Sequence, residues 1–412
     1  MTSAAAHQTI AHRFLRFVRD ADWLTAERAG IFARLWLAIS VLVSVGWLAL
    51  SRHNVDWLGK PVGTDFASFW TASRLALSGN PAKVYDLAAH HAAQIRLFGR
   101  DVGYYAFFYP PIFLLICLPL ASLPYLASLG AWLAATGAAY AHVVRKYLGG
   151  RGSWIIVLAF PAVLINVGHG QNAFLSAALF GGGVLLLDRR PVLAGLLLGC
   201  LVYKPHLGIV IPVALLASGR WRTILGAAGA VVALTLLSVW VFGLGPWRAF
   251  LTTLPIARMA LEQNLVGNAR MQSVFAAVRL LHGGLGLAYA AQAMAALGGC
   301  AALIYCERKA FRAPAEGPAL VAATLLASPF LLDYDLVLLG IPLAWLTARG
   351  LKTGFQPWEK IILAAGFVLP AISRNIAINI GAPIGPVVVA AVFWLVLRRW
   401  AKDSAAGLDN AL

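Results

Sequence analysis

The sequence predicts an all-α polytopic membrane protein, a bundle of about twelve transmembrane helices. Three observations indicate this. Of the 412 residues, 60% are hydrophobic and only 12% are charged, whereas a soluble domain carries roughly 25% charged residues. Apolar runs cover the chain from Ile31 to its end. Lysines and arginines cluster in short loops between these runs, which explains the net charge of +17 without a nucleic-acid partner.

The first element is an N-terminal membrane anchor. Ile31–Leu50 is an apolar run of 20 residues, the length of a full membrane span and longer than the 7–15-residue core of a signal peptide. Several arginines precede it. We therefore expect residues 1–30 to be a cytoplasmic segment and the anchor to stay uncleaved.

The remaining elements follow from alternating crossings. Later apolar runs fall near residues 125–145, 153–168, 172–187, 191–203, 205–218, 223–243, 285–306, 317–331, 335–348, 358–377 and 383–398. Basic residues mark six loops that should face the cytoplasm: Arg145/Lys146/Arg151, Asp188-Arg189-Arg190, Arg220/Arg222, Arg308/Lys309/Arg312, Arg349/Lys352 and Arg398/Arg399/Lys402. All six do so if the proline-broken segment 109–123 adds no crossing. We therefore predict a re-entrant or half-depth helix there.

Two longer segments remain on the outer face, 51–109 and 244–283. In the first, Phe66, Phe69, Trp70 and Leu77 recur at helical spacing, and a second amphipathic stretch ends at Gly99. We predict two interfacial helices with their apolar faces toward the bilayer. The whole chain, 1–412, is expected to form one integral membrane domain with a cytoplasmic tail at 400–412.

Asp65 is the acidic residue whose context stands out. Seven acidic residues face outward on this topology: Asp56, Asp65, Asp86, Asp101, Glu262, Asp333 and Asp335. Asp65 opens the aromatic helix of the stretch Gly63-Thr64-Asp65-Phe66. Its spacing favours helix capping over catalysis. The two roles are compatible, because a helix N-terminus favours the ionised carboxylate that a general base needs.

Two outward turns carry further polar residues. One is Gly168-His169-Gly170-Gln171-Asn172 and the other is Tyr203-Lys204-Pro205-His206. A lysine in lipid costs roughly 2.5–3.5 kcal/mol, so Lys204 is expected either to face a polar cavity and bind an anion such as phosphate, or to snorkel to the interface. The histidines are given hydrogen-bonding roles. Tyr109 opens the half-depth helix, where its prolines suit a helix start and its ring would line the entrance for a lipid.

Metal and nucleotide chemistry receive little support. Asp333 and Asp335 form a D-x-D pair that can hold a divalent cation or orient sugar hydroxyls. We assign no metal site and no certain cofactor. The four cysteines lie in apolar runs without metal-site spacing. Arg270 and Arg374 are candidate phosphate contacts, although a surface position is the simpler interpretation of each alone.

Taken together, the motifs make the chain resemble glycosyltransferase family 87, integral-membrane enzymes of the GT-C class. They are G-T-D-F-A-S-F-W with G-N-P-A-K-V-Y-D, F-Y-P-P, G-H-G-Q-N, L-V-Y-K-P-H, N-A-R-M-Q-S and S-P-F-L-L-D-Y-D, in that order over nearly the whole chain. The resemblance implies a GT-C-like fold in a bacterial cytoplasmic membrane, with the active site facing the periplasm. It also implies a polyprenyl-phosphate sugar as donor and a glycolipid or glycan as acceptor. The family includes α-1,2-mannosyltransferases of phosphatidylinositol mannoside synthesis and arabinofuranosyltransferases of cell-wall glycans.

The resemblance implies a role for Asp65, and the polar motifs themselves supply the other candidate contacts. The family's first-loop aspartate, taken as catalytic, matches Asp65. We expect an inverting transfer, with mannose as the favoured sugar and arabinofuranose as the alternative. Donor phosphate contacts are expected at Lys204, His206 and Arg270. Substrate contacts are expected at Tyr109, His169, Gln171, Asn172, Tyr203, Gln272, Asp333 and Asp335. Actinobacterial mannosyltransferases carry a His-His pair near Asp333-Tyr334-Asp335, where this chain differs.

Two other classes remain open. A solute transporter or lipid flippase is suggested by the short Gly- and Pro-broken helices at 153–218. Against it, the sequence has no internal symmetry, and its polar candidates gather at the outward face. A non-catalytic partner in envelope synthesis is the third class.

Overall fold

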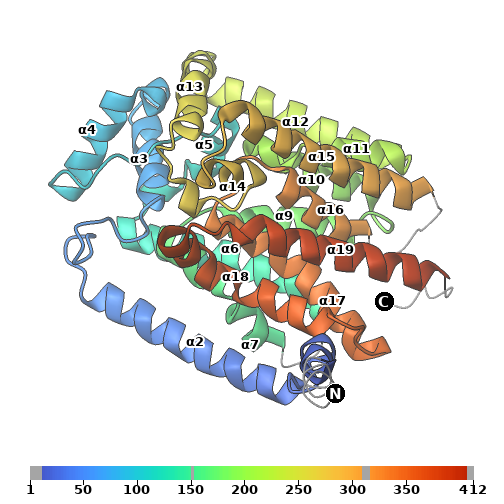
Figure 1. Cartoon of the computed structure of the whole chain (residues 1–412). Coiled ribbons are helices and arrows are strands. Elements are labelled where there is room, and N and C mark those ends of the chain that lie inside the picture. The colour runs from blue at the N-terminus through green and yellow to red at the C-terminus, as the bar shows by residue number, and fades with distance from the viewer. Residues whose placement is uncertain (1–11, 150–152, 309–315, 406–412) are drawn as a thin grey trace.

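The computed structural model describes residues 12–149, 153–308 and 316–405, and these residues are almost entirely helical (Figure 1). They contain no β-strand, only isolated bridges such as the one between Met271 and Leu332. The prediction of an all-α protein is therefore confirmed for the described residues.

Among the described residues, six helical segments are long and apolar enough to cross a membrane. They are α2 (Ala26–Ala49), α12 (Trp221–Phe242), α15 (Leu285–Arg308), η6 with α17 (Asp333–Leu339 and Gly340–Thr353), α18 (Glu359–Ile380) and α19 (Ile384–Ala405). A further helix, α6 (Tyr125–Leu148), has 24 residues. The membrane class is thus supported, while the expected total of about twelve crossings stays a prediction.

Several predicted spans are short or broken helices. They are α7 (Ser153–Leu158), α8 (Pro161–His169), α9 (Ala173–Leu185), α10 (Pro191–Gly199), α11 (Ile211–Ala217) and α16 (Glu316–Ala327), with the 3-10 helices η3 (Cys200–Tyr203) and η4 (Pro205–Leu207). The 13 residues of α9 extend about 20 Å, less than the roughly 30 Å of a bilayer core. Prolines begin α8, α10 and η4, where their missing N–H costs no helical hydrogen bond. The chain therefore turns within the bundle, and the polar motifs lie at these turns.

The segment 109–123 also forms short elements, α5 (Pro111–Cys117) and η2 (Leu120–Ser122). A seven-residue helix extends about 10 Å. Its re-entrant or half-depth placement stays a prediction.

Charged loops predicted to share one face are tied together by ion pairs. Arg349 pairs with Asp403 at 2.7 Å, and Arg399 pairs with Glu359. The backbone N–H of Trp358 donates to the carbonyl of Arg19 at 2.7 Å. Figure 1 places the start of α2 and the end of α19 at the same end of the bundle. This arrangement is the one expected if the N-terminal segment and the C-terminal loops lie on one side.

The two segments predicted to face outward pack together at the opposite end. The first contains α3 (Phe66–Leu77), η1 (Pro81–Tyr85) and α4 (Leu87–Phe98). The second contains α13 (Gly245–Glu262), η5 (Asn268–Arg270) and α14 (Val274–Leu280). The ring centres of Tyr85 and Phe250 lie 5.8 Å apart, and α13 packs against η1 and α5 (Figure 1).

One expectation about this region is wrong. The apolar face of α3 was predicted to rest on the bilayer, but Phe66 and Phe69 are completely or nearly buried in protein. Phe69 contacts the rings of Phe113 and Trp132 at 5.0 and 6.2 Å. Helical periodicity shows that a face is apolar, but it does not show whether lipid or protein covers that face.

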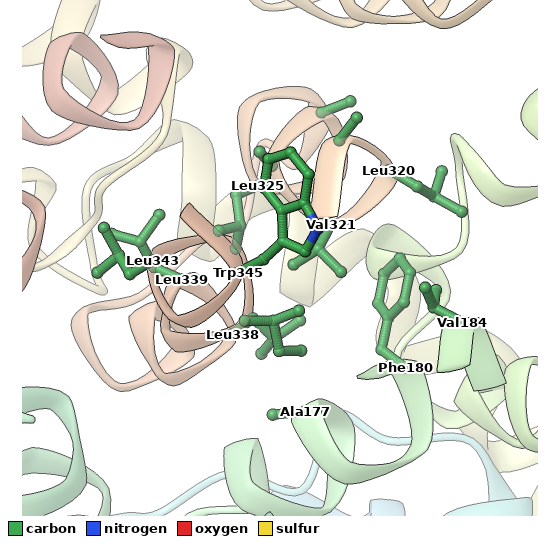
Figure 2. Close-up of a cluster of buried hydrophobic side chains, with 14 of the residues drawn as sticks. Ala177, Phe180, Val184, Leu320, Val321, Leu325, Leu338, Leu339, Leu343 and Trp345 are labelled. Atoms are coloured by element: carbon green, nitrogen blue, oxygen red, sulfur yellow. The ribbon is translucent and has the colours of Figure 1, made fainter. Parts of the chain in front are cut away.

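The core that supports the turns lies between α9, α16, η6 and α17 (Figure 2). Its side chains include Ala177, Phe180 and Val184 of α9, Leu320, Val321 and Leu325 of α16, and Leu338, Leu339, Leu343 and Trp345 of η6 and α17. Close packing makes such interiors stiff. The N-terminal end of α9 and the D-Y-D segment of η6 are therefore held in a fixed relation to each other.

Candidate active site

Asp65 is the N-cap residue of α3, but its carboxylate does not cap the helix. The first amides of the helix donate to backbone carbonyls instead: the N–H groups of Phe66, Ala67 and Ser68 bond to Gly63, Thr64 and Asp65. The predicted capping role is therefore wrong. Because backbone carbonyls satisfy these amides, the half-buried carboxylate is available for other contacts.

The turn after α8 docks onto the start of α3. The backbone N–H of Asp65 donates to the carbonyl of His169 at 3.0 Å. The Thr64 hydroxyl bonds to Nδ1 of His169 at 2.8 Å. Gly170 has φ +59°, and a Cβ there would lie 2.6 Å from Cβ of Phe66. Glycine is thus required both by the left-handed conformation and by the close approach of the two segments.

Gln171 bonds to Asp65 and to two tyrosines. Its Nε2 lies 3.1 Å from Oδ2 of Asp65, 3.2 Å from the hydroxyl of Tyr334 and 3.3 Å from the hydroxyl of Tyr109. The side chain is 4% exposed. The sequence grouped three of these residues as site candidates; the structure adds Tyr334 to the group.

Lys204 and Asp335 form a buried ion pair beside this group. Nζ of Lys204 lies 2.6 Å from Oδ1 of Asp335, and the two side chains are 4% and 2% exposed. The ammonium also lies 5.2 Å from the ring centre of Tyr334. The expected polar environment of Lys204 is therefore supplied by the protein itself. Its predicted contact with a donor phosphate stays a prediction.

Asp333 and Asp335 point to different cations. Oδ2 of Asp333 lies 3.7 Å from Nη1 of Arg374, while Asp335 binds Lys204. Within the described ranges, no group of three His, Cys, Asp or Glu side chains is arranged to hold a metal ion. The two carboxylates therefore do not bind one common cation in this arrangement.

The other predicted contacts differ in accessibility. Tyr203 is 1% exposed, its hydroxyl bonds to Ser176 at 2.8 Å, and its ring stacks on Phe113. Nδ1 of His206 bonds to the Ser328 hydroxyl at 2.8 Å.

Asn172 is fully buried, and neither Oδ1 nor Nδ2 has a partner among the described residues. Such an amide has one donor and one acceptor group available for a bound polar molecule.

The second outward segment reaches the same region through a backbone bridge. The N–H of Gln272 donates to the carbonyl of Leu331 at 2.7 Å, two residues before Asp333, and the Gln272 side chain is buried.

Arg270 is exposed and forms no ion pair within the described part of the chain. Burial raises the pKa of Tyr105 to about 12; the charge of Asp65 contributes to the increase, and the guanidinium of Arg270 opposes it. Arg270 therefore lies within electrostatic range of the loop that adjoins Asp65.

Sequence reasoning missed Tyr334 and Thr64 as members of this site. Tyr334 lay between two carboxylates that were already candidates, but nothing in the spacing indicated that its hydroxyl would meet Gln171, 163 residues earlier. Thr64 likewise meets His169 across 105 residues. Only the packing of α3, α8 and η6 brings these groups together.

Comparison with known proteins gives one result. No curated protein and no solved structure matches the chain at a significant level. The model of glycosyltransferase family 87 matches residues 107–329. This range contains Tyr109, the turn at Gln171, Lys204 and Arg270, while Asp65 and the D-Y-D segment lie outside it. Because the match covers more than half of the chain, the protein belongs to glycosyltransferase family 87.

Proposed function

We propose that the protein is an inverting glycosyltransferase that moves a sugar, with mannose favoured, from a polyprenyl-phosphate donor to a lipid or glycan acceptor. The reaction would take place at the periplasmic face of a bacterial cytoplasmic membrane. One observation carries the proposal. Asp65 has no cationic partner among the described residues, and its carboxylate lies at a helix N-terminus within a cluster of polar side chains. Membership of the family supports the reaction class.

In the proposed mechanism, Asp65 is the general base. Its carboxylate accepts the proton of the acceptor hydroxyl while that oxygen attacks the anomeric carbon. The bond between this carbon and the phosphate oxygen breaks, and its electron pair leaves with the lipid phosphate. The leaving group is already a stable anion, so a second carboxylic acid of the kind used in glycoside hydrolysis is not required.

Among the three candidates, Arg270 is the residue that we favour as the contact for the donor phosphate. Its guanidinium is exposed and unpaired within the described residues, and arginine binds phosphate through two parallel hydrogen bonds. The charge of Lys204 is already balanced by Asp335. Lys204 could bind the phosphate only by sharing or exchanging this partner. We therefore give the first role to Arg270 and keep Lys204 and His206 as additional candidates.

The decisive experiment compares Asp65→Asn with Asp86→Asn in proteoliposomes supplied with a panel of polyprenyl-phosphate sugars. A positioned general base contributes about 10²–10⁴ in rate, so Asp65→Asn should lower transfer by at least that range. Asp86→Asn is a matched control in the same outward segment. Asp86 caps α4 through a 3.0 Å bond to the N–H of Ala89, and asparagine caps equally well.

The same set of donors also identifies the sugar. Release of polyprenyl phosphate from the mannose donor supports the favoured assignment, and release from the arabinofuranose donor supports the alternative. Near-normal transfer by Asp65→Asn would remove Asp65 from the mechanism.

A transporter or flippase is the second candidate, and one observation favours it. The helices α8 to α11 are short, two of them begin at a proline, and they are joined by polar turns within the bundle, which is typical of the discontinuous helices of transporters. Flux of a solute or lipid without glycosyl transfer in the same proteoliposomes would support this candidate. If neither activity occurs, a non-catalytic role in envelope synthesis becomes the better explanation.

A further inference from the structure

The amide of Gln171 is fully engaged by the protein. Oε1 accepts from the backbone N–H of Asn172 at 2.8 Å, and because a backbone N–H can only donate, this bond fixes which amide atom is the oxygen. Oε1 also accepts from the Tyr109 hydroxyl at 3.3 Å. Nε2 therefore faces Asp65 and Tyr334, and the same Tyr109 hydroxyl lies 3.3 Å from it. With 4% of its surface exposed, Gln171 has little area left for a substrate.

The backbone around Gln171 is also fixed. Its carbonyl accepts from Nδ2 of Asn166 at 3.2 Å, and Oδ1 of Asn166 accepts from the N–H of Ala173 at 3.3 Å. Asn166 thus bridges the turn between α8 and α9. The backbone that carries the Gln171 amide is therefore held on both sides of the turn.

We propose that Gln171 is the positioning residue of the base Asp65 rather than a substrate contact. This inference rests on the proposed function. Nε2 holds Oδ2 of Asp65 at 3.1 Å, which leaves Oδ1 to accept the proton from the acceptor hydroxyl. The same nitrogen bonds to Tyr334 at 3.2 Å, so the base and the D-Y-D segment are aligned through one amide.

The two hydrogen bonds of Nε2 limit the distance between the Asp65 carboxylate and the Tyr334 hydroxyl. Oδ2 of Asp65 and the hydroxyl of Tyr334 both bond to Nε2, so their separation cannot exceed the sum of those two distances, about 6.3 Å. The amide therefore keeps the base and the phenol in the same part of the site. Loss of the amide would remove this constraint and let the carboxylate turn away.

The first test is Gln171→Met, which keeps a side chain of similar length without hydrogen-bonding atoms. A misplacement of about 1 Å costs about 100-fold in rate, so we expect kcat to fall 10- to 100-fold. The KM values for donor and acceptor should change by less than about threefold, because no substrate contact is removed. A raised KM with kcat unchanged would overturn the proposal. Rates are normalised to the monodisperse folded fraction.

The second test is the pH dependence of Gln171→Glu. A second carboxylate beside Asp65 disfavours ionisation of the pair, so the acid limb of the pH–rate profile should move to higher pH. A role in folding alone would lower activity equally at every pH, and that result would contradict the proposal.

Gln292→Glu is the matched control. Gln292 is also a buried amide bonded at both ends, with Oε1 accepting from Phe275 N–H at 2.9 Å and Nε2 donating to the Leu326 carbonyl at 2.8 Å. It has no bond to Asp65. This variant should lose stability but keep the acid limb in place.

Comparison of the two single variants separates failure of this inference from failure of the proposed function. If Asp65→Asn transfers sugar normally, the base assignment fails and the positioning role fails with it. If Asp65→Asn is inactive while Gln171→Met keeps its full kcat, only the positioning role fails. We expect Asp65→Asn combined with Gln171→Met to be no slower than Asp65→Asn alone, because the amide acts only through the carboxylate.

Discussion

The buried ion pair between Lys204 and Asp335 gives a prediction whose size follows from its geometry. Removing either charge should destabilise the protein strongly, whereas replacing both by apolar residues should not. The pair is 2.6 Å long, and its side chains are 4% and 2% exposed. Lys204→Met leaves the Asp335 carboxylate buried, and its remaining hydrogen-bond partner within the described ranges is the N–H of Leu332 at 3.3 Å.

The energies typical of buried ion pairs decide the expected order of stabilities. Breaking a buried pair by removing one partner costs about 3–5 kcal/mol, because the remaining charge is uncompensated. Replacing both partners by apolar residues is often neutral or stabilising by about 1–4 kcal/mol. Loss of the bond from the Leu332 N–H costs about 1–3 kcal/mol. The double variant Lys204→Met/Asp335→Leu should therefore be more stable than either Lys204→Met or Asp335→Leu alone.

The assay is denaturant unfolding in detergent micelles, followed by tryptophan fluorescence, together with donor titrations of the transfer reaction. If the pair is structural, the double variant recovers both stability and the donor KM. If Lys204 also binds the donor phosphate, stability returns but the donor KM stays high. A double variant destabilised by the sum of the two single effects would refute the reasoning, because the two charges would then act independently.

Two further predictions concern the turn after α8 and the first outward segment. Gly170→Ala places a methyl group 2.6 Å from Cβ of Phe66, so thermal melting should detect a loss well above the roughly 1–2 kcal/mol of left-handed strain. Gly219→Ala is the control, because Gly219 has φ +66° and no atom within 4 Å of the added methyl group, so this variant should lose only the strain energy. Equal losses of stability in the two variants would contradict a clash between residue 170 and Phe66. Burial lowers the pKa of His90 in α4 from 6.5 to about 4, so the unfolded segment binds a proton between these values and the folded segment does not. Hydrogen exchange of α4 should therefore show stability falling from pH 6.5 to pH 4, by up to about 1.4 kcal/mol per pH unit. His90→Gln should remove this slope, and a slope that persists in that variant would be evidence against His90.

Much of the fold could be predicted from local sequence. Long apolar runs, such as those that become α12 and α15, are sufficient to identify helices of membrane length. The basic loops indicated a common side, in agreement with the contacts between Arg19 and Trp358 and between Arg349 and Asp403. The number of crossings could not be predicted in this way. A run of apolar residues indicates that a segment is buried, but it does not indicate how far the segment extends across the membrane. Several of the predicted spans are short helices, and residues of α9 and α16 pack into the protein core.

The candidate site was predicted in part. Asp65, Lys204 and the turn at Gln171 were identified as outward polar features, and Gln171 links Asp65 to Tyr334, over whose ring Lys204 lies. The capping role expected for Asp65 was wrong because the amides of the first turn found backbone carbonyls. Statistical preference for aspartate at this position describes an average helix start, and it does not describe the carbonyls that a preceding glycine turn provides.

The sequence by itself determined the membrane class, the helical elements, the polarity of the loops and the family. These properties depend on composition, on periodicity and on the order of short motifs, all of which are local. Only the tertiary structure decided which polar groups meet. A lysine in an apolar run requires a partner, but that partner proved to be Asp335, 131 residues away. The physical reason is that a buried charge must be compensated, while the identity of the compensating group depends on how the broken helices pack.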